Sequence, residues 1–340
     1  MGKFYPEFSV RFAELLAGVA GRTVAVIGHS RPDGDCIGSQ VALSRVLSTR
    51  GSKAVCVNAD MAPRRLGYVA RAVDFIKTDE ALLLPADTVA IFVDCADHDR
   101  AGTRLRARFP APAGNIDHHL SNCGFAAINI VDSGSAATCE MLTGLFIDAG
   151  LPIDASTAAA LFAGIVTDTG QFRYNSTSQR CFVLAGELVA RGAVPYQAGY
   201  ELFERESLGK LRLLQAFLAS MVMECGGRVC VGTLPAGIFA ATGTTAEDTE
   251  GLVDYARSVD GVEIGVLIEE RLDGGVKASL RCKDPRCRLD LVAGLFGGGG
   301  HACAAGLNVK NAAGDFRARL LTAIGDQLKA VDADRPTTEA

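Results

Sequence analysis

The 340-residue sequence lacks any apolar run of about eighteen residues, the length that a membrane-spanning helix needs. Its first stretch, residues 1–21, is interrupted by Glu7, Arg11 and Glu14 and so lacks the apolar segment of a signal peptide. We therefore expect a cytoplasmic protein that has no membrane partner.

Closely spaced cysteine pairs are also missing. The eleven cysteines include no Cys-X-X-Cys pair, and the shortest spacings are Cys225 to Cys230 and Cys282 to Cys287. In a chain of this length the pattern favours reduced, mostly buried thiols over a disulfide framework. It also disfavours a structural zinc site, which normally uses tighter ligand pairs.

The sequence also has no excess of basic residues. It contains 34 Lys and Arg residues and 39 Asp and Glu residues, which gives a net charge of −5. Proteins that bind long nucleic acid make many Lys and Arg contacts with its phosphates. We therefore expect no long duplex partner, and any nucleic-acid substrate should be short.

The hydrophobic pattern changes along the chain. In the first part, short β-branched runs alternate with helical patterns, which predicts an α/β domain with βαβ units and a parallel sheet covered by helices on both faces. In the second part, Gly226-Gly227 and Asp273-Gly274-Gly275 separate pairs of strand-like runs, which predicts hairpins in a smaller mixed-sheet α+β domain. The predicted limits are 1–190 for the first domain, 191–215 for a linker, 216–332 for the second domain and 333–340 for a disordered tail.

The individual elements follow from the same pattern. In the first domain we expect strands at 23–28, 54–58, 88–93 and 114–116, and helices at 38–49, 154–167 and 178–191. In the second domain, helical patterns span 247–258 and 316–331. Open α/β sheets bind ligands beyond the carboxyl ends of their strands, so we expect His29, Asp94 and Asp117 to converge there.

Metal-binding residue types gather directly after the first predicted strand. The loop contains His29, Asp33 and Asp35, which place one imidazole and two carboxylates close together in the sequence. These ligands suit Mn²⁺, Mg²⁺ or Fe²⁺, whereas structural zinc favours thiolates. The alternative is a solvated turn in which Asp35 only caps the following helix.

Three further groups of such residues follow. Asp94 ends a predicted strand, and the run Asp117, His118 and His119 ends another, where adjacent side chains on extended backbone would point in opposite directions. Asp168 closes a predicted helix, and a carboxylate at the negative end of the helix dipole invites a cation. The alternative for Asp94 is a loop or cap residue, and for Asp168 a polar turn.

The order HxxPDGDxxGS, VDxxD, DHH and TDTGxF, which runs from His29 through Phe172, resembles the motifs of the DHH phosphoesterase superfamily. The resemblance implies a catalytic first domain with two divalent cations, of which Mn²⁺ is the expected ion and Mg²⁺ the alternative. The implied ligands are His29, Asp33 and Asp94 for the first cation, and Asp35, Asp94, His118 and Asp168 for the second. The resemblance also implies catalytic roles for Asp117, which orients its neighbours, and for His119, which approaches the substrate phosphate.

The second domain resembles the domain called DHHA1. The signature GGGH followed by AAG is present at 298–301 and 304–306, and the run 277–281 matches the family's basic strand. Glycine backbone allows N–H groups to come close to an anion, and Arg281 and His301 add charge and donors for a phosphate. The alternative is a glycine-rich helix end that binds nothing. The implied substrate-binding residues are Arg281, Gly299, Gly300 and His301.

The two-domain layout resembles the stand-alone oligoribonuclease and pAp-phosphatase group of this superfamily, the nanoRNases. This resemblance implies hydrolysis of very short oligoribonucleotides such as pApA, or of the nucleotide bisphosphate 3′-phosphoadenosine 5′-phosphate, and it suggests a homodimer. RecJ-type exonucleases carry extra domains for which the chain has no room, and family II inorganic pyrophosphatases lack the GGGH run. Two alternatives stay open, a cyclic di-AMP phosphodiesterase and a non-catalytic nucleotide-binding regulatory protein.

Overall fold

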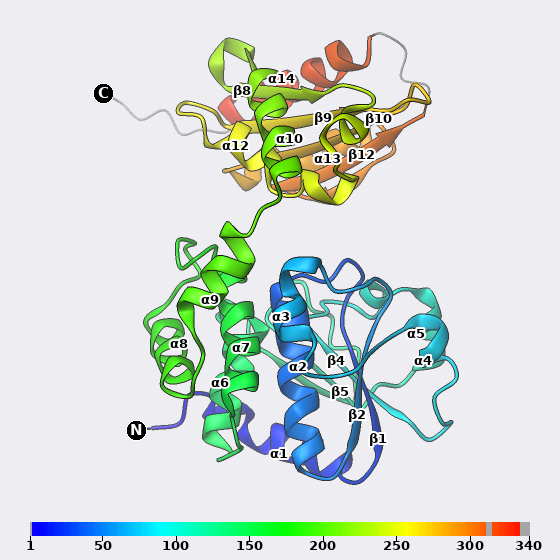
Figure 1. The fold of residues 1–340 in the computed structure, drawn as a ribbon, viewed down its shortest axis with the longest axis vertical. Helices are drawn as coiled ribbons and strands as arrows, with labels where there is room; N and C mark the ends of the chain where they lie inside the picture. Colours follow the sequence, from blue (N-terminus) through cyan, green and yellow to red (C-terminus); the bar gives the residue numbers. More distant parts are fainter. Residues whose placement is uncertain (1, 311–314, 334–340) are drawn as a thin grey trace. The chain divides into compact units, whose positions relative to one another are not determined.

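The computed structural model describes residues 2–310 and 315–333, and the chain divides into two compact units between Arg205 and Glu206 (Figure 1). Positions 334–340 of the predicted tail lie outside the described residues. Much of the predicted linker is helical. It contains α9 (Pro195–Gly199), a π-helical turn (Tyr200–Glu204) and the start of α10 (Leu208–Ala219).

A six-stranded parallel sheet with the order β3-β2-β1-β4-β5-β6 forms the centre of the N-terminal unit and confirms the predicted α/β class. The strand order reverses between β1 and β4, which is the point at which such sheets bind ligands. The two edge strands, β3 and β6, are short and were not predicted. The strands are β1 (Thr23–Ile27), β2 (Lys53–Asn58), β3 (Phe75–Lys77), β4 (Val89–Val93), β5 (Gly114–Asp117) and β6 (Ile128–Val131).

Helices cover both faces of this sheet, as predicted (Figure 1). Val24 and Val26 of β1 belong to a core with the helices α1, α2, α6 and α7, whereas Ala25 and Ile27 belong to a second core with α4 and α5. The helices of this unit are α1 (Ser9–Gly18), α2 (Gly34–Thr49), α3 (Gly67–Ala70), α4 (Thr78–Ala81), α5 (Thr103–Arg108), α6 (Thr138–Asp148), α7 (Ala155–Asp168) and α8 (Gln179–Ala190), followed by α9.

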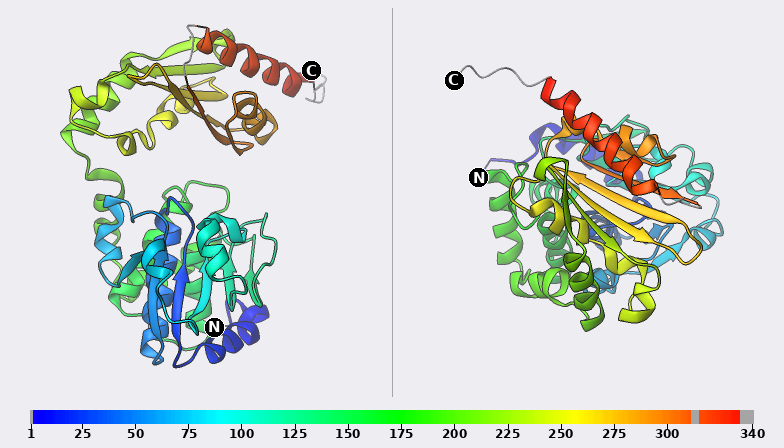
Figure 2. Two further views of the ribbon diagram at one scale, coloured as in Figure 1. Left: turned by 90° about the vertical axis from the view of Figure 1, so that its right-hand side faces the viewer. Right: turned by 90° about the horizontal axis from the view of Figure 1, so that it is seen from above.

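The C-terminal unit contains a mixed sheet with the order β11-β12-β10-β9-β8-β7. Strands β8 and β9 pair in parallel and the other neighbours pair antiparallel, so both predicted hairpins, β7–β8 and β9–β10, are confirmed. Figure 2 shows α14 lying across this sheet. The strands are β7 (Val222–Glu224), β8 (Val229–Leu234), β9 (Ile264–Glu270), β10 (Val276–Cys282), β11 (Gly299–His301) and β12 (Ala304–Val309); the helices after α10 are α11 (Ile238–Thr242), α12 (Leu252–Ser258), α13 (Leu289–Gly294) and α14 (Phe316–Ala333).

Two helix boundaries differ from the prediction. Helix α2 begins at Gly34, four residues before the predicted start at position 38, because the side chain of Asp33 caps it by accepting hydrogen bonds from the first turn. The predicted helix at 247–258 is divided into a 3-10 turn and α12, because Gly251 adopts a φ of +83° between them. The helices that were not predicted include α1, α5, α6 and α13.

The thiols are free, as predicted. All eleven cysteines lack a disulfide partner, and most of them are buried. Cys123 is the exposed one, whereas Cys225 and Cys303 are partly exposed.

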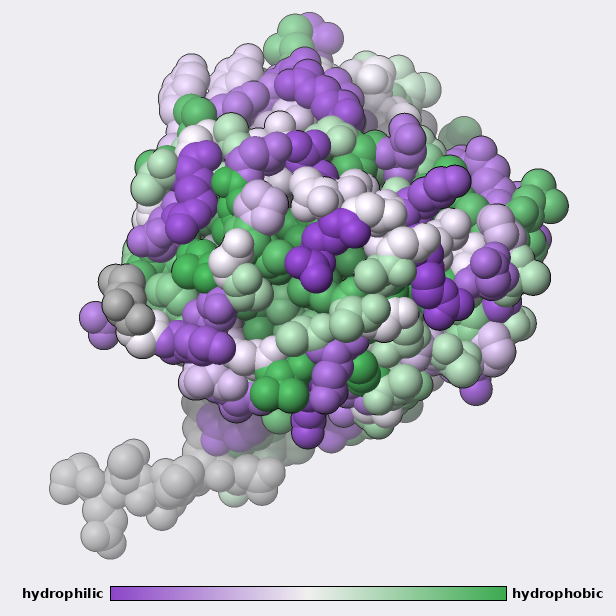
Figure 3. Space-filling view, turned by 90° about the horizontal axis from the view of Figure 1, so that it is seen from below, coloured by the Kyte–Doolittle hydropathy of each residue, from purple (hydrophilic) through white to green (hydrophobic). Residues whose placement is uncertain are grey.

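No helix in the described part of the chain is both long and apolar enough to span a lipid bilayer. On the face shown in Figure 3, hydrophilic residues are scattered among apolar ones. That face therefore offers no continuous hydrophilic track.

Candidate metal centre

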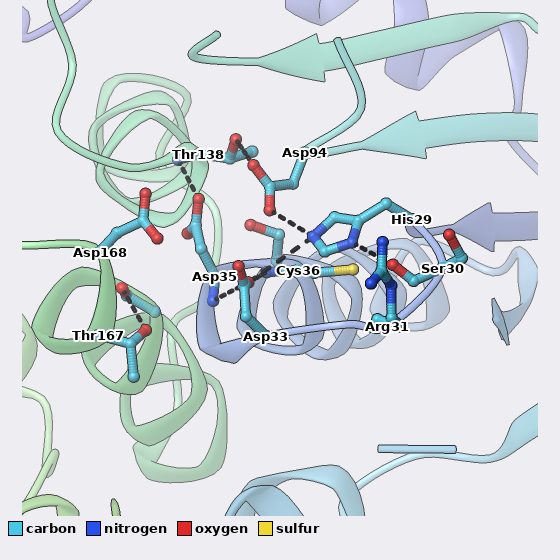
Figure 4. Close-up of polar contacts among 12 residues, drawn as sticks. His29, Ser30, Arg31, Asp33, Asp35, Cys36, Asp94, Thr138, Thr167 and Asp168 are labelled. Carbon is cyan, nitrogen blue, oxygen red and sulfur yellow. Dashed lines mark hydrogen bonds and ion pairs between the residues drawn. The ribbon is translucent and has the colours of Figure 1, made fainter. Parts of the chain in front are cut away.

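His29 lies directly beyond β1, at the point where the strand order reverses. Its imidazole is almost fully buried, and Nδ1 donates a hydrogen bond to the carbonyl oxygen of Ser30 (2.9 Å). The other nitrogen, Nε2, lies 3.3 Å from Oδ2 of Asp94 and 3.8 Å from Oδ1 of Asp33 (Figure 4). Because Nδ1 is engaged by Ser30, Nε2 is the nitrogen that faces the two carboxylates, which is the position from which an imidazole can bind a metal ion.

Helix α2 supplies two carboxylates with different surroundings. Asp33 caps the helix, accepts hydrogen bonds from the N–H groups of Asp35 and Cys36 (both 3.1 Å), and is half exposed. Asp35 is fully buried, and its two oxygens accept hydrogen bonds from the N–H groups of Thr138 (2.6 Å) and Cys139 (2.8 Å). The positive end of α6 therefore holds the Asp35 carboxylate in one orientation.

Asp94 occupies the middle of the site. Its backbone is left-handed, with a φ of +57°, a conformation that costs a non-glycine residue about 1–3 kcal/mol and is typical of functional sites. Oδ2 faces His29, whereas Oδ1 lies 3.6 Å from Nε2 of His118 and 3.7 Å from Nδ1 of His119. Thr138 Oγ1 donates to the same Oδ1 (3.3 Å). The two oxygens of one carboxylate thus face two different sets of donor atoms.

The run Asp117-His118-His119 ends β5. Asp117 is fully buried and accepts hydrogen bonds from Nδ1 of His119 (2.7 Å) and from Nδ2 of Asn122 (2.6 Å). The prediction that the two imidazoles point in opposite directions is wrong, because the ring centroids lie 4.7 Å apart. The strand ends at Asp117, so the alternation of extended backbone does not apply to the two histidines that follow.

Asp168 is the last residue of α7 and joins the site through His118. Its Oδ2 lies 3.2 Å from Nε2 of His118, which is also 3.9 Å from Oδ2 of Asp35. The other nitrogen of His118, Nδ1, lies 3.3 Å from the carbonyl oxygen of Ser135 and donates to it. His118 therefore presents Nε2 to three carboxylates at once.

Three groups of potential ligand atoms result. In each group the atoms lie within 4.8 Å of one another, and Asp94 belongs to two of the groups. Asp33 is in none of them, although it lies 3.8 Å from Nε2 of His29 and accepts hydrogen bonds from the N–H groups of Asp35 and Cys36. Cys36, which was not predicted as a ligand, is in the first group. The groups among the described residues are His29, Cys36 and Asp94; Asp94, His118 and His119; and Asp35, His118 and Asp168.

The charges of this cluster favour a cation. Burial, followed by the charge of Asp94, raises the pKa of Asp35 to about 7. Burial and the charge of Asp35 also raise the pKa of Asp168 well above its usual value. Carboxylates that are this crowded and this poorly hydrated are stabilised in their charged form by divalent cations.

The nature of the donors indicates which cations fit. Burial raises the pKa of the Cys36 thiol to about 11, which disfavours the thiolate form that a metal ligand requires. The remaining donors are carboxylate oxygens and imidazole nitrogens, the set preferred by Mn²⁺ and shared in part by Mg²⁺. The residues present therefore fit hard or borderline divalent cations.

His119 differs from the other two histidines because a carboxylate holds it. The hydrogen bond with Asp117 raises the pKa of His119, and burial opposes this effect. In Asp117, burial is the largest influence and would raise the pKa, but the hydrogen bonds from His119 and Asn122, together with the charges of the two histidines, outweigh it and the pKa is lowered. The pair keeps the His119 ring in one orientation with Nε2 free.

The predicted phosphate-binding residues lie together in the C-terminal unit. Arg281 on β10 and His301 on β11 both pair with Ala304 of β12, so the two side chains are at the same level of the sheet. The Arg281 guanidinium donates to the carbonyl of Leu280 (3.0 Å), and within the described residues it has no carboxylate partner. Gly300 has a φ of +145°, and a Cβ there would lie 2.4 Å from the carbonyl oxygen of Ala304. Only glycine suits this position.

Several residues that hold the proposed ligands in place were not predicted from the sequence. Ser135 contributes a carbonyl oxygen, and Thr138 an N–H group and a hydroxyl, so their roles depend mainly on backbone position. Asn122 contributes an amide that holds Asp117 and also donates to Asn115 Oδ1 (2.7 Å). A short polar residue soon after Asp-His-His was the one available signal for Asn122.

Family models match both units. The model described as the N-terminal domain of the DHH family matches residues 23–165, and the model described as the DHHA1 domain matches residues 226–330.

Named relatives match along most of their length. A bifunctional oligoribonuclease and PAP phosphatase NrnA from Thermus thermophilus is 31% identical over 298 residues, which are 88% of this chain and 87% of that protein. The protein with the same name from Bacillus subtilis is 27% identical over 84% of this chain and 89% of its own length.

Solved structures share the fold. An exopolyphosphatase-related protein from Bacteroides fragilis has a TM-score of 0.87 at 22% identity and covers 96% of this chain and 98% of its own. RecJ from Thermus thermophilus, solved with Mn²⁺, has a TM-score of 0.51 at 14% identity, and the match covers 96% of this chain and 55% of that one. At these identities the likeness concerns the fold.

Proposed function

The chain belongs to the DHH family, and on this premise we propose that it is a metal-dependent phosphoesterase that hydrolyses very short oligoribonucleotides and 3′-phosphoadenosine 5′-phosphate to mononucleotides. The observation that carries the proposal is the convergence of carboxylates and imidazoles around Asp94, at the point where the strand order of the parallel sheet reverses. The substrate class is supported by the two NrnA relatives, whose names are those of an oligoribonuclease and a PAP phosphatase.

Two sets of side chains would hold the cations. When bound, two divalent cations lower the pKa of water and neutralise charge on a phosphate. The carboxylate of Asp94 has one oxygen toward each set, which suits a shared ligand. Mn²⁺ is the ion that we propose. The first set is His29, Asp33 and Asp94, and the second is Asp35, Asp94, His118 and Asp168.

His119 is the residue that we propose to contact the phosphate that reacts. Asp117 accepts a hydrogen bond from Nδ1 (2.7 Å), which leaves Nε2 to donate to a phosphate oxygen or to the leaving oxygen. The ring is partly exposed, with 28% of the side chain accessible, so a substrate has access to it. Asp117 acts through His119, because it is itself fully buried.

The C-terminal unit would bind a phosphate group. We assign a phosphate to Arg281, Gly299, Gly300 and His301, because a guanidinium that has no carboxylate partner among the described residues, an imidazole and exposed glycine backbone lie together there. Binding at these residues would favour a short substrate with a terminal phosphate.

An assay of metal-stripped protein tests the proposal. The protein is treated with EDTA, supplied with Mn²⁺ or Mg²⁺, and assayed side by side on pApA, 3′-phosphoadenosine 5′-phosphate and cyclic di-AMP. We expect hydrolysis of the first two with Mn²⁺ and no hydrolysis without a cation. Asp94→Asn should lower the rate by more than about a hundredfold, because it weakens both cation sites.

The control for this assay is Asp87→Asn, which changes an exposed carboxylate at a loop. It should retain wild-type activity. If Asp94→Asn hydrolyses pApA as fast as the control, the chain does not use the centre described here. Hydrolysis of cyclic di-AMP in place of the other substrates would reassign the substrate class.

A further inference from the structure

Residues 132–140, which follow β6 and enter α6, contact two of the proposed ligands through their backbone. We call them the support segment. The carbonyl oxygen of Ser135 accepts a hydrogen bond from Nδ1 of His118 (3.3 Å). The N–H group of Thr138 donates to Oδ2 of Asp35 (2.6 Å). A shift of the support segment would therefore disturb both ligands.

One side chain from another helix holds this segment at three places. Arg180 lies in the first turn of α8, and its Nε donates to Oε1 of Glu140 (2.9 Å). Its Nη2 donates to Oδ2 of Asp132 and to Oγ of Ser135 (both 2.9 Å). The planar guanidinium thus joins the beginning, the middle and the end of the support segment.

The surroundings of Arg180 make these contacts hard to replace. Glu140 is fully buried, and its second oxygen accepts a hydrogen bond from the N–H group of Ala136 (2.7 Å). The guanidinium lies over the ring of Tyr5 at 4.4 Å, and the Tyr5 hydroxyl is 2.9 Å from Oγ of Ser135. A lysine keeps the positive charge but lacks the planar set of donors that reaches all three acceptors.

We infer that Arg180 is a positioning residue of the metal centre, which orients His118 and Asp35 by fixing the support segment. It touches neither the proposed cations nor the substrate. It sets the position of the Ser135 carbonyl, which accepts the hydrogen bond from Nδ1 of His118. It also sets the position of the N–H groups that hold the Asp35 carboxylate. The inference rests on the proposed function, because it concerns the same centre.

The test compares the same substitution at two arginines, one in the first turn of α8 and one that follows its last residue. Arg180→Lys alters the support segment, whereas Arg191→Lys alters a pair with Glu187 at the other end of the helix. The two side chains have similar exposure, 30% and 33%. Mn²⁺ binding to the metal-stripped proteins is measured by calorimetry, together with kcat and KM for pApA and the melting temperature in EDTA.

We expect Arg180→Lys to bind Mn²⁺ about ten- to a hundredfold more weakly than wild type, as found for residues that orient metal ligands. Its kcat should fall while KM changes little. Arg191→Lys should match wild type in both. If Arg180→Lys folds poorly, Arg180→Ala is measured with added guanidinium ion at millimolar concentration, which should restore part of the Mn²⁺ affinity.

A lower melting temperature with unchanged Mn²⁺ affinity in Arg180→Lys would overturn the inference, because the residue would then only stabilise the fold. Equal losses of affinity in the Arg180 and Arg191 variants, or the lack of any rescue by guanidinium ion, would also overturn it. Failure of the wild-type protein to bind Mn²⁺ is a different result, which would remove the proposed function itself.

Discussion

The three histidines of the metal centre are each held through Nδ1. His29 donates to the carbonyl of Ser30, His118 donates to a carbonyl in the support segment, and His119 donates to the carboxylate of Asp117. Each contact orients the ring and leaves Nε2 available for a cation or a substrate. Two of the three acceptors are main-chain oxygens, so any residue type at those positions would supply them.

Asp132 of the support segment should contribute to stability in a pH-dependent way. Burial is the largest influence and would raise its pKa, whereas hydrogen bonds from Ser135 and the Gly134 N–H lower it. Arg180 adds to this effect, and the pKa is lowered in the folded protein. In the unfolded chain an aspartate titrates near pH 3.9, so the stabilisation is present above about that pH and is lost as the pH falls through the folded pKa.

The Asp132→Asn variant should therefore lose less stability than the wild-type protein between about pH 5 and pH 3. Urea unfolding in EDTA at a series of pH values measures the difference. Asp87→Asn, which changes an exposed carboxylate, is the control and should follow the wild-type curve. Parallel curves for Asp132→Asn and wild type would contradict the assignment.

At the scale of elements, α2 and α7 pack closely because of glycine. A Cβ at Gly38 would lie 2.4 Å from the carbonyl oxygen of Ala160 on α7 and 2.9 Å from Sγ of Cys139 on α6. The same helix, α2, carries Asp33 and Asp35 at its first turn. The packing of α2 and the position of these carboxylates are therefore coupled.

Gly38→Ala should destabilise the protein by about 1–3 kcal/mol, because the added methyl group meets backbone that cannot move freely. It should also weaken Mn²⁺ binding. Gly186→Ala in α8 is the matched control, since a Cβ there has nothing within 4 Å, and it should stabilise the helix by about 0.5–1 kcal/mol. Urea unfolding and Mn²⁺ calorimetry check both variants, and equal effects of the two substitutions would refute the argument.

The elements that were predicted and those that were missed differ in physical character. The central strands β1, β2, β4 and β5 are runs of β-branched and apolar residues, and their limits agree with prediction within about two residues. The edge strand β3 has three residues and α3 has four, which is too short for a periodic signal. Helix α6 is buried along most of its length and shows no polar face.

The same contrast holds for the centre. The sequence predicted that residues at the ends of strands, such as His29, Asp94 and Asp117, lie close together, because the carboxyl ends of parallel strands meet at one edge of the sheet. The role of the support segment could not be predicted from the sequence, because Ser135 and Thr138 hold His118 and Asp35 through backbone groups. The role of Arg180 could not be predicted either, because its partners Glu140 and Asp132 are 40 and 48 positions away from it in the sequence.

At the scale of the whole molecule, each unit has apolar cores of its own. The N-terminal unit contains the cores on the two faces of the parallel sheet, and the C-terminal unit contains two further cores around its mixed sheet. The change in hydrophobic pattern along the sequence predicted two domains of these types. Every side chain proposed as a ligand belongs to the N-terminal unit, so the effect of a cation on stability should be confined to it.

Calorimetric scans of the whole protein with and without Mn²⁺ test this expectation. A ligand at about a hundred times its Kd stabilises the folded state by about 2.7 kcal/mol, which for a unit of this size corresponds to a rise in melting temperature of roughly 5–10 °C. We expect one transition to shift by this amount and a second transition, from the C-terminal unit, to stay in place. In Asp94→Asn neither transition should move, since both cation sites lose a ligand. A shift of both transitions in the wild-type protein would mean that Mn²⁺ also binds outside the centre or that the two units unfold together.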